Sequence, residues 1–81
     1  MPTCSFRELE KVCTALGLES RQGKHGTIWK GISPLTHAPI SPISVHEHAR
    51  GRDIPDVTLR KYVRELGFRS YEEFREYLDK L

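Results

Sequence analysis

The spacing of the apolar residues changes twice along this chain, and this change restricts the possible folds more than any other feature. Over residues 5–16 apolar side chains recur every three or four positions, which is the period of an amphipathic helix. Ser5 and Glu8 have the spacing of a capping box, and Gly17 is a typical residue after a helix end. The pattern predicts a helix over residues 5–16.

The middle of the chain has the composition of strands joined by turns. Residues 18–22 are polar and can form a strand that enters a tight turn at residues 23–26. Residues 27–32 are rich in β-branched and aromatic side chains, and residues 43–46 alternate apolar and polar positions, so both segments are typical of strands. Between them, residues 33–42 hold three prolines and are expected to form mainly a loop.

Helical spacing returns in the last third of the chain. Asp53 or Asp56 can cap a second helix that ends at Gly67, and Ser70 opens a third helix with capping-box spacing. The predicted order is α-β-β-β-α followed by a terminal helix. Three consecutive strands favour an antiparallel meander with helices on one face. We expect residues 1–81 to form one α+β domain, a two-layer sandwich with the architecture of the double-stranded-RNA-binding domain.

Charge and cysteine content limit where such a protein works and what it binds. The 13 Lys and Arg residues slightly outnumber the 11 Asp and Glu residues, a balance that permits contact with a phosphate backbone without requiring it. Cys4 and Cys13 are too far apart along the predicted helical segment for a disulfide bond, so we expect free thiols, with Cys13 in the core.

No signal-peptide pattern opens the chain, and no apolar run approaches about 20 residues. We therefore expect a cytoplasmic protein without a membrane span.

Three groups of short motifs follow one another along residues 6–78. They are Phe6-Arg7-Glu8-Leu9-Glu10-Lys11-Val12 with Leu16-Gly17-Leu18; Gly23-Lys24-His25 leading into Ile28-Trp29-Lys30; and Ile43-Ser44-Val45-His46, Ile54-Pro55, Thr58-Leu59-Arg60-Lys61 and Arg64-Glu65-Leu66-Gly67. Together these motifs resemble HicA-type toxins, also described as the YcfA-like family. Each motif alone is weak, and the resemblance rests on their order and spacing in a short chain.

The resemblance implies a fold and an activity. Its family fold is α-β-β-β-α, similar to the double-stranded-RNA-binding domain, and its members are ribosome-independent mRNA endonucleases. The family's catalytic histidine corresponds to His25, which closes the Gly-x-His motif. By this resemblance the chain is the toxin of a type II toxin–antitoxin system, an endoribonuclease without a cofactor. A HicB-like antitoxin is expected to silence it by covering the His25 face.

The chain also departs from the family pattern in three places. Residues 31–42 are longer than the tight turn usual between these strands, and residues 46–51 are expanded. Asp56-Val57 stands where the family often has a basic residue and a glycine. These departures leave the predicted fold unchanged. They bear on the expected substrate preference, antitoxin pairing and activity.

Histidine chemistry suits RNA cleavage without a metal. RNA carries its own nucleophile, the 2′-OH, so cleavage needs a general base for that proton and a general acid for the leaving 5′ oxygen. An imidazole can do either task because its unperturbed pKa of about 6.5 lies near neutrality. His25 is therefore the candidate catalytic residue.

The expected RNA contacts surround His25. Period-2 alternation places His25 and Trp29 on one strand face and Ile28 and Ile32 on the other. If the two isoleucines meet the helices, His25 is accessible and Trp29 can stack on an unpaired base. The other expected RNA contacts are Lys24, Lys30, Arg50 and Arg52.

Several residues have alternative interpretations. Trp29 is more often a core residue than a stacking platform. His46 and His48, with Glu47 and a distant His37, hint at a metal site, but no further ligand follows at a zinc spacing, so we expect none. His46 can alternatively act as a second proton-transfer group or as a phosphate contact.

Two other functions are compatible with the same sequence. One is a non-catalytic RNA-binding domain, which would use a basic surface of Arg50, Arg52, Arg60, Lys61 and Arg64. The other is a protein-interaction module, such as an inactive toxin relative, which would bind a protein partner and no RNA.

Overall fold

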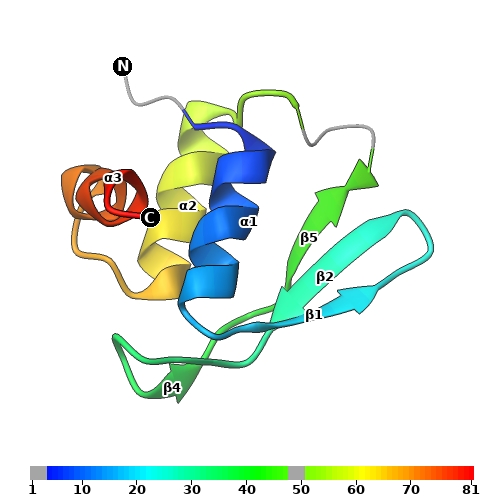
Figure 1. The fold of residues 1–81 in the computed structure, drawn as a ribbon, viewed down its shortest axis with the longest axis horizontal. Coiled ribbons are helices and arrows are strands. Elements are labelled where there is room, and N and C mark those ends of the chain that lie inside the picture. The colour runs from blue at the N-terminus through cyan, green and yellow to red at the C-terminus, as the bar shows by residue number, and fades with distance from the viewer. Residues whose placement is uncertain (1–3, 48–50) are drawn as a thin grey trace.

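Three helices and five strands make up the part of the chain that the computed structural model describes, residues 4–47 and 51–81 (Figure 1). They are α1 (Phe6–Ala15), β1 (Glu19–Gln22), β2 (Gly26–Lys30), β3 (Ile32–Ser33), β4 (Ala38–Pro39), β5 (Ile43–His46), α2 (Asp56–Leu66) and α3 (Tyr71–Asp79). The predicted α+β class is confirmed, as is the order of the three helices around the strands. None of the described helices is long and apolar enough to cross a membrane.

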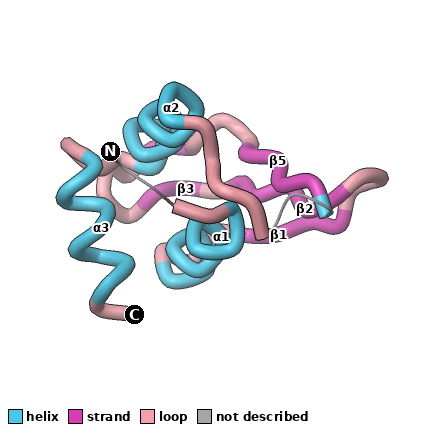
Figure 2. Tube along the Cα trace, turned by 90° about the horizontal axis from the view of Figure 1, so that it is seen from above, coloured by secondary structure: helices cyan, strands magenta, loops and turns pink. Residues whose placement is uncertain are grey.

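Strands β1, β2 and β5 form one antiparallel sheet in that order, which is the predicted meander. Gln22 of β1 pairs with Thr27 of β2, and Thr27 pairs in turn with Val45 of β5. Figure 1 shows the helices gathered on one side of this sheet, and both views place α3 at the end of the molecule away from β1 and β2 (Figure 2). The sheet therefore has one face covered by helices and one open face.

The hydrophobic core lies between the covered sheet face and the helices. Trp29 of β2 and Ile43 and Val45 of β5 supply the sheet side of this core. The helices supply Leu9, Val12 and Cys13 from α1, Leu59, Val63 and Leu66 from α2, and Phe74 and Leu78 from α3. Each helix thus buries one apolar face, as expected of an amphipathic helix.

The proline-rich segment differs from the prediction because it contains a short hairpin. Residues 32–33 pair with residues 38–39 as strands β3 and β4. The buried hydroxyl of Ser33 donates a 2.6 Å hydrogen bond to the carbonyl oxygen of Leu66, which ties this hairpin to the end of α2. The strand predicted over residues 27–32 is accordingly interrupted, since β2 ends at Lys30.

Local hydrogen bonds set the starts of α1 and α3. The side chain of Ser5 accepts from the backbone N–H of Glu8, and the carboxylate of Glu8 accepts from the backbone N–H of Ser5. This reciprocal pair is the predicted capping box. At α3 the side chain of Ser70 accepts from the backbone N–H of Glu73, so Ser70 is the predicted cap.

The start of α2 does not follow the prediction. Its N-cap is Pro55, and no side chain caps the helix, so the expected cap at Asp53 or Asp56 is wrong. Asp53 instead forms a β-bridge with Ser5, and Asp56 is the first helical residue. At the other end Gly67 adopts a left-handed conformation with φ of 102°, as expected of a glycine after a helix.

Candidate functional site

The candidate catalytic histidine lies in the tight turn between β1 and β2. The backbone N–H of Gly23 donates to the carbonyl oxygen of Gly26 at 2.6 Å, which closes the turn. Lys24 and His25 lie exposed between these two glycines. The carbonyl oxygen of His25 also accepts a 3.1 Å hydrogen bond from the backbone N–H of Glu47, just after β5. The backbone at His25 is therefore held against β5 while its imidazole stays accessible.

Gly26 allows this close approach of the turn to β5. A Cβ atom at position 26 would overlap the carbonyl oxygen of Val45 and would lie 2.9 Å from the Cα of His46. No side chain fits there without moving the strands apart. The glycine after His25 is therefore a requirement of the β2–β5 pairing, which the Gly-x-His motif alone did not reveal.

Strand alternation places His46 on the same side of the sheet as the open face. Thr27 and Val45 are a register pair, and both are buried against the helices. The neighbouring pair, Gly26 and His46, must then face the opposite side, because successive side chains alternate between faces. His46 is exposed there, beside the turn that carries His25.

Two adjoining hollows lie between the turn and β5. The smaller, of about 190 Å³, is lined by the turn, by Ile28 and Ser44 on the open sheet face, and by His46. The other, of about 480 Å³, is lined by Lys24, His25, His46 and Glu47. Two imidazoles, one ammonium group and one carboxylate therefore surround one open space, and this combination can transfer protons and hold an anion.

Trp29 is a core residue, which is the alternative favoured from the sequence, and its placement on the accessible face as an RNA contact is wrong. Trp29 is buried, with 8% of its surface exposed, and its indole Nε1 donates a 3.1 Å hydrogen bond to the carboxylate of Glu10 on α1. The pairing of β2 with β5 sets this orientation, because Trp29 lies opposite the buried Ile43. Ile28 is only half-buried on the open face, and Ile32 is 64% exposed. Trp29 cannot stack on a base in this structure.

The basic residues predicted to contact RNA are only partly brought together. Lys24 lines both hollows beside His25. Lys30 is exposed at the other end of β2, opposite Glu19. Arg52 is exposed near the start of α1, where its carbonyl oxygen accepts from the N–H of Phe6. Neither Lys30 nor Arg52 lines the hollows, and Arg50 lies outside the described residues.

The suggested metal site gains no support from the described ranges. Within residues 4–47 and 51–81, no group of three or more His, Cys, Asp or Glu side chains is arranged to hold a metal ion. His37 lies in the turn of the β3–β4 hairpin and does not line the hollows beside His46. His48 lies outside the described residues.

The two cysteines are free, as predicted, and Cys4 is buried as well as the predicted core residue Cys13. Neither lines the hollows beside His25. Burial raises the pKa of the Cys4 and Cys13 thiols from 9.0 to about 12. Both thiols are therefore protonated at neutral pH, and a protonated thiol is a poor nucleophile. Neither cysteine therefore supplies a nucleophile at neutral pH.

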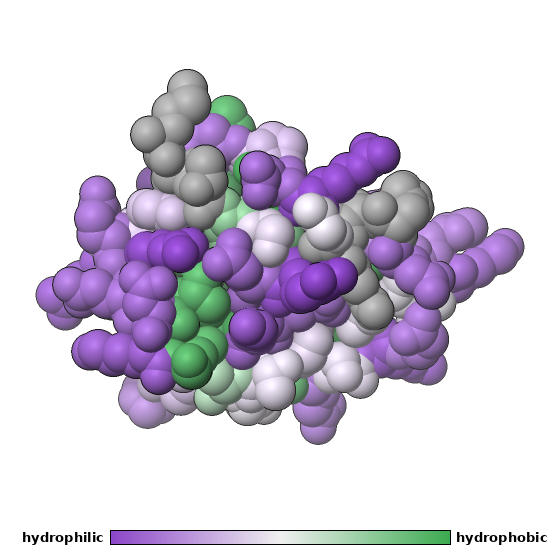
Figure 3. Space-filling model, turned by 45° about the horizontal axis from the view of Figure 1, so that its top comes forward, coloured by the Kyte–Doolittle hydropathy of each residue, from purple (hydrophilic) through white to green (hydrophobic). Residues whose placement is uncertain are grey.

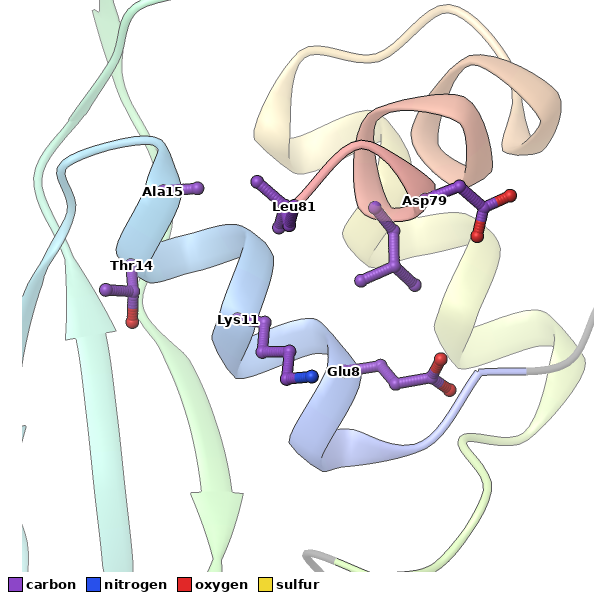
Figure 4. Close-up of a pocket in the computed structure, with 7 residues that line it drawn as sticks. Glu8, Lys11, Thr14, Ala15, Asp79 and Leu81 are labelled. Atoms are coloured by element: carbon purple, nitrogen blue, oxygen red, sulfur yellow. The ribbon is translucent and has the colours of Figure 1, made fainter.

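Two further hollows have different chemistry. One, of about 440 Å³, lies between α1 and α3, where Figure 4 shows Leu81 between the two helices and Lys11 and Glu8 along α1. It holds no histidine, and its Thr14 hydroxyl donates to the carbonyl oxygen of Glu10. The other, of about 850 Å³, lies between α2 and α3 and is lined by Arg60, Arg64 and Arg69 among others. Only the latter is suited to binding a polyanion.

The surface in Figure 3 is mainly hydrophilic, with a narrow apolar strip between polar side chains.

No family model, no curated protein and no solved structure matches this chain. The protein is thus a small α+β fold with helices on one face of the sheet and a hollow lined by His25 and His46 at the edge of the open face.

Proposed function

We propose that this protein is a metal-independent endoribonuclease that cleaves mRNA, with His25 transferring a proton in the reaction. The observation that carries the proposal is the position of His25. Its imidazole is exposed at a turn whose backbone is fixed to β5, and it lines a hollow together with Lys24 and His46. This position suits a group that must reach a phosphodiester from a rigid support.

The sequence resemblance to HicA-type toxins supports the same function. The order of helices and strands is compatible with the double-stranded-RNA-binding-domain-like fold that the resemblance implies, and we propose that fold for the sheet and its covering helices. The protein is then the toxin of a toxin–antitoxin pair that acts in the cytoplasm. Its HicB-like antitoxin would cover the turn and the open sheet face, since blocking that face denies RNA access to His25.

Lys24 supplies the charge that such a reaction needs. The phosphate gains negative charge on its non-bridging oxygens as the 2′ oxygen attacks, and a nearby ammonium group stabilises that charge. Lys24 precedes His25 in the turn and lines both hollows. This position supports a role for Lys24 in contacting the phosphate on which His25 acts.

Cleavage of a labelled mRNA in excess chelator tests this proposal. We expect the unmodified protein to cut, and the folded His25→Ala variant to cut roughly 10²–10⁴-fold more slowly, the usual contribution of a positioned proton-transfer group. His37→Asn is the matched control, because His37 is an exposed histidine of the β3–β4 hairpin and asparagine tolerates its positive φ of 58°. This control should cut at the unmodified rate. Equal cutting by His25→Ala, shown folded by circular dichroism, would refute the role of His25.

A non-catalytic RNA-binding protein is the second candidate, and the hollow between α2 and α3 favours it. Its three arginines, Arg60, Arg64 and Arg69, can contact a phosphate backbone without any chemistry. Binding of RNA that weakens with salt, survives His25→Ala and is never followed by cleavage would select this function over the nuclease.

A further inference from the structure

We infer that His46 is the second proton-transfer group of the site and acts together with His25 on one phosphodiester. This inference rests on the proposed ribonuclease function and extends it, since the sequence resemblance assigns chemistry to His25 alone. The two histidines are 21 positions apart in the sequence, but they line the same hollow of about 480 Å³.

The sheet register brings His46 beside the turn that carries His25. His46 lies opposite Gly26, the residue after His25, and the N–H of Glu47 donates to the carbonyl oxygen of His25. The absence of a side chain at Gly26 lets β5 approach the turn closely. Two hydrogen-bonded segments therefore hold His25 and His46 at the rim of one space, and both side chains are exposed to substrate.

The reaction needs two proton transfers at different atoms. A neutral imidazole takes the proton of the 2′-OH while the 2′ oxygen forms a bond to phosphorus. The bond from phosphorus to the 5′ oxygen breaks, and an imidazolium gives its proton to that oxygen. The products are a 2′,3′-cyclic phosphate and a free 5′-OH, and exchange with water restores both histidines. A single imidazole cannot start as base and acid at once, whereas two imidazoles at one phosphate can.

The other charged groups at the hollow are few. Lys24 from the turn and Glu47 after β5 line it with the two histidines, and the remaining residues of the adjoining hollow are uncharged: Gly23, Gly26, Thr27, Ile28, Ser44 and Val45. Lys24 is suited to the phosphate rather than to proton transfer, because an ammonium group remains charged near neutral pH. The two imidazoles are therefore the groups at this hollow suited to accepting and donating a proton.

The dependence of the cleavage rate on pH provides the first test. We would measure single-turnover cleavage in excess chelator for the unmodified protein, His25→Gln, His46→Gln and the control His37→Asn. The unmodified protein and the control should give bell-shaped profiles, because one imidazole must be neutral and the other protonated. His46→Gln should be roughly 10²–10⁴-fold slower and should lose one limb of the bell. His25→Gln should lose the other limb.

A substrate with sulfur in place of the 5′ bridging oxygen gives the second test. A thiolate leaves without protonation, so this substrate should restore the variant that lacks the acid to within about tenfold of the unmodified protein. It should not restore the variant that lacks the base. The restored variant then identifies the acid, and either assignment supports the two-histidine site.

The outcomes separate this inference from the proposed function. If the unmodified protein cuts and folded His46→Gln cuts equally fast, the inference is wrong and the function of His25 stands. A slower His46→Gln that keeps both limbs, or a failure of the sulfur substrate to restore either variant, also overturns it. If the unmodified protein does not cut RNA, the proposed function itself fails.

Discussion

Replacing Gly26 with alanine is expected to destabilise the protein by about 1–3 kcal/mol or more and to abolish RNA cleavage. The new Cβ would overlap the carbonyl oxygen of Val45, and the Cα of His46 lies 2.9 Å away. Backbone atoms of a paired strand cannot move aside as a flexible side chain can, so β5 must separate from β2. Stability and activity are lost together, because this pairing also brings His46 to the turn that carries His25.

Gly51→Ala provides the matched control for that substitution. A Cβ at Gly51 would meet no atom of the described residues within 4 Å. We expect the control to unfold at the urea concentration of the unmodified protein and to cut RNA at the same rate. Urea titrations followed by circular dichroism measure the first quantity. An unchanged midpoint for Gly26→Ala would contradict the requirement for a glycine at the β2–β5 contact.

Truncation of Phe74 to alanine is expected to cost about 3–5 kcal/mol, the usual range for a fully buried phenylalanine. Phe74 is 0% exposed, and its ring packs edge-to-face on Phe68 with centroids 5.5 Å apart. The side chain holds α3 against the rest of the core. Because the whole stability of a small domain is about 5–15 kcal/mol, this loss shifts the unfolding midpoint strongly.

Leu81→Ala is the control for the Phe74 substitution. Leu81 follows α3 and is 58% exposed, so its truncation removes little buried surface and should change the stability by less than about 0.5 kcal/mol. The comparison is made by the same urea titrations. Equal midpoints for Phe74→Ala and Leu81→Ala would mean that α3 contributes little to the folded state.

The helices were predictable because their signals are local. The Ser5–Glu8 capping box, the Ser70 cap and the glycine after α2 act within a few residues of the chain, so spacing alone identifies them. The start of α2 was not predictable in this way. Asp53 is drawn into a bridge with Ser5, and the sequence around Asp53 contains no sign of that distant partner.

Which face of each strand is buried depends on contacts between residues far apart in the sequence, and local patterns do not reveal those contacts. Alternation in β2 identified two faces but could not tell which face is buried, since Trp29 and Ile28 are both suitable core residues. The register with β5 decides it, because Trp29 lies opposite Ile43. The β3–β4 hairpin was missed for a related reason: the hydrogen bond from Ser33 to Leu66 joins residues 33 positions apart.

The candidate site was predictable only in part. The Gly-x-His motif identified an exposed His25 and an adjacent Lys24, and both line the hollow. The position of His46 beside His25 depends on strand pairing. From the sequence alone, a second proton-transfer group was only one of several possible roles for His46. Lys30 and Arg52 were grouped with His25 by their charge, but they lie at other parts of the fold.

The contact between Trp29 and Glu10 gives the protein an internal optical reporter. The chain has one tryptophan, and its indole lies between the sheet and α1, on the sheet face opposite to His46. Its fluorescence should therefore follow the separation of the helix layer from the sheet and should change little when RNA occupies the open face. Strong quenching by RNA would instead mean that the two layers part when the substrate binds.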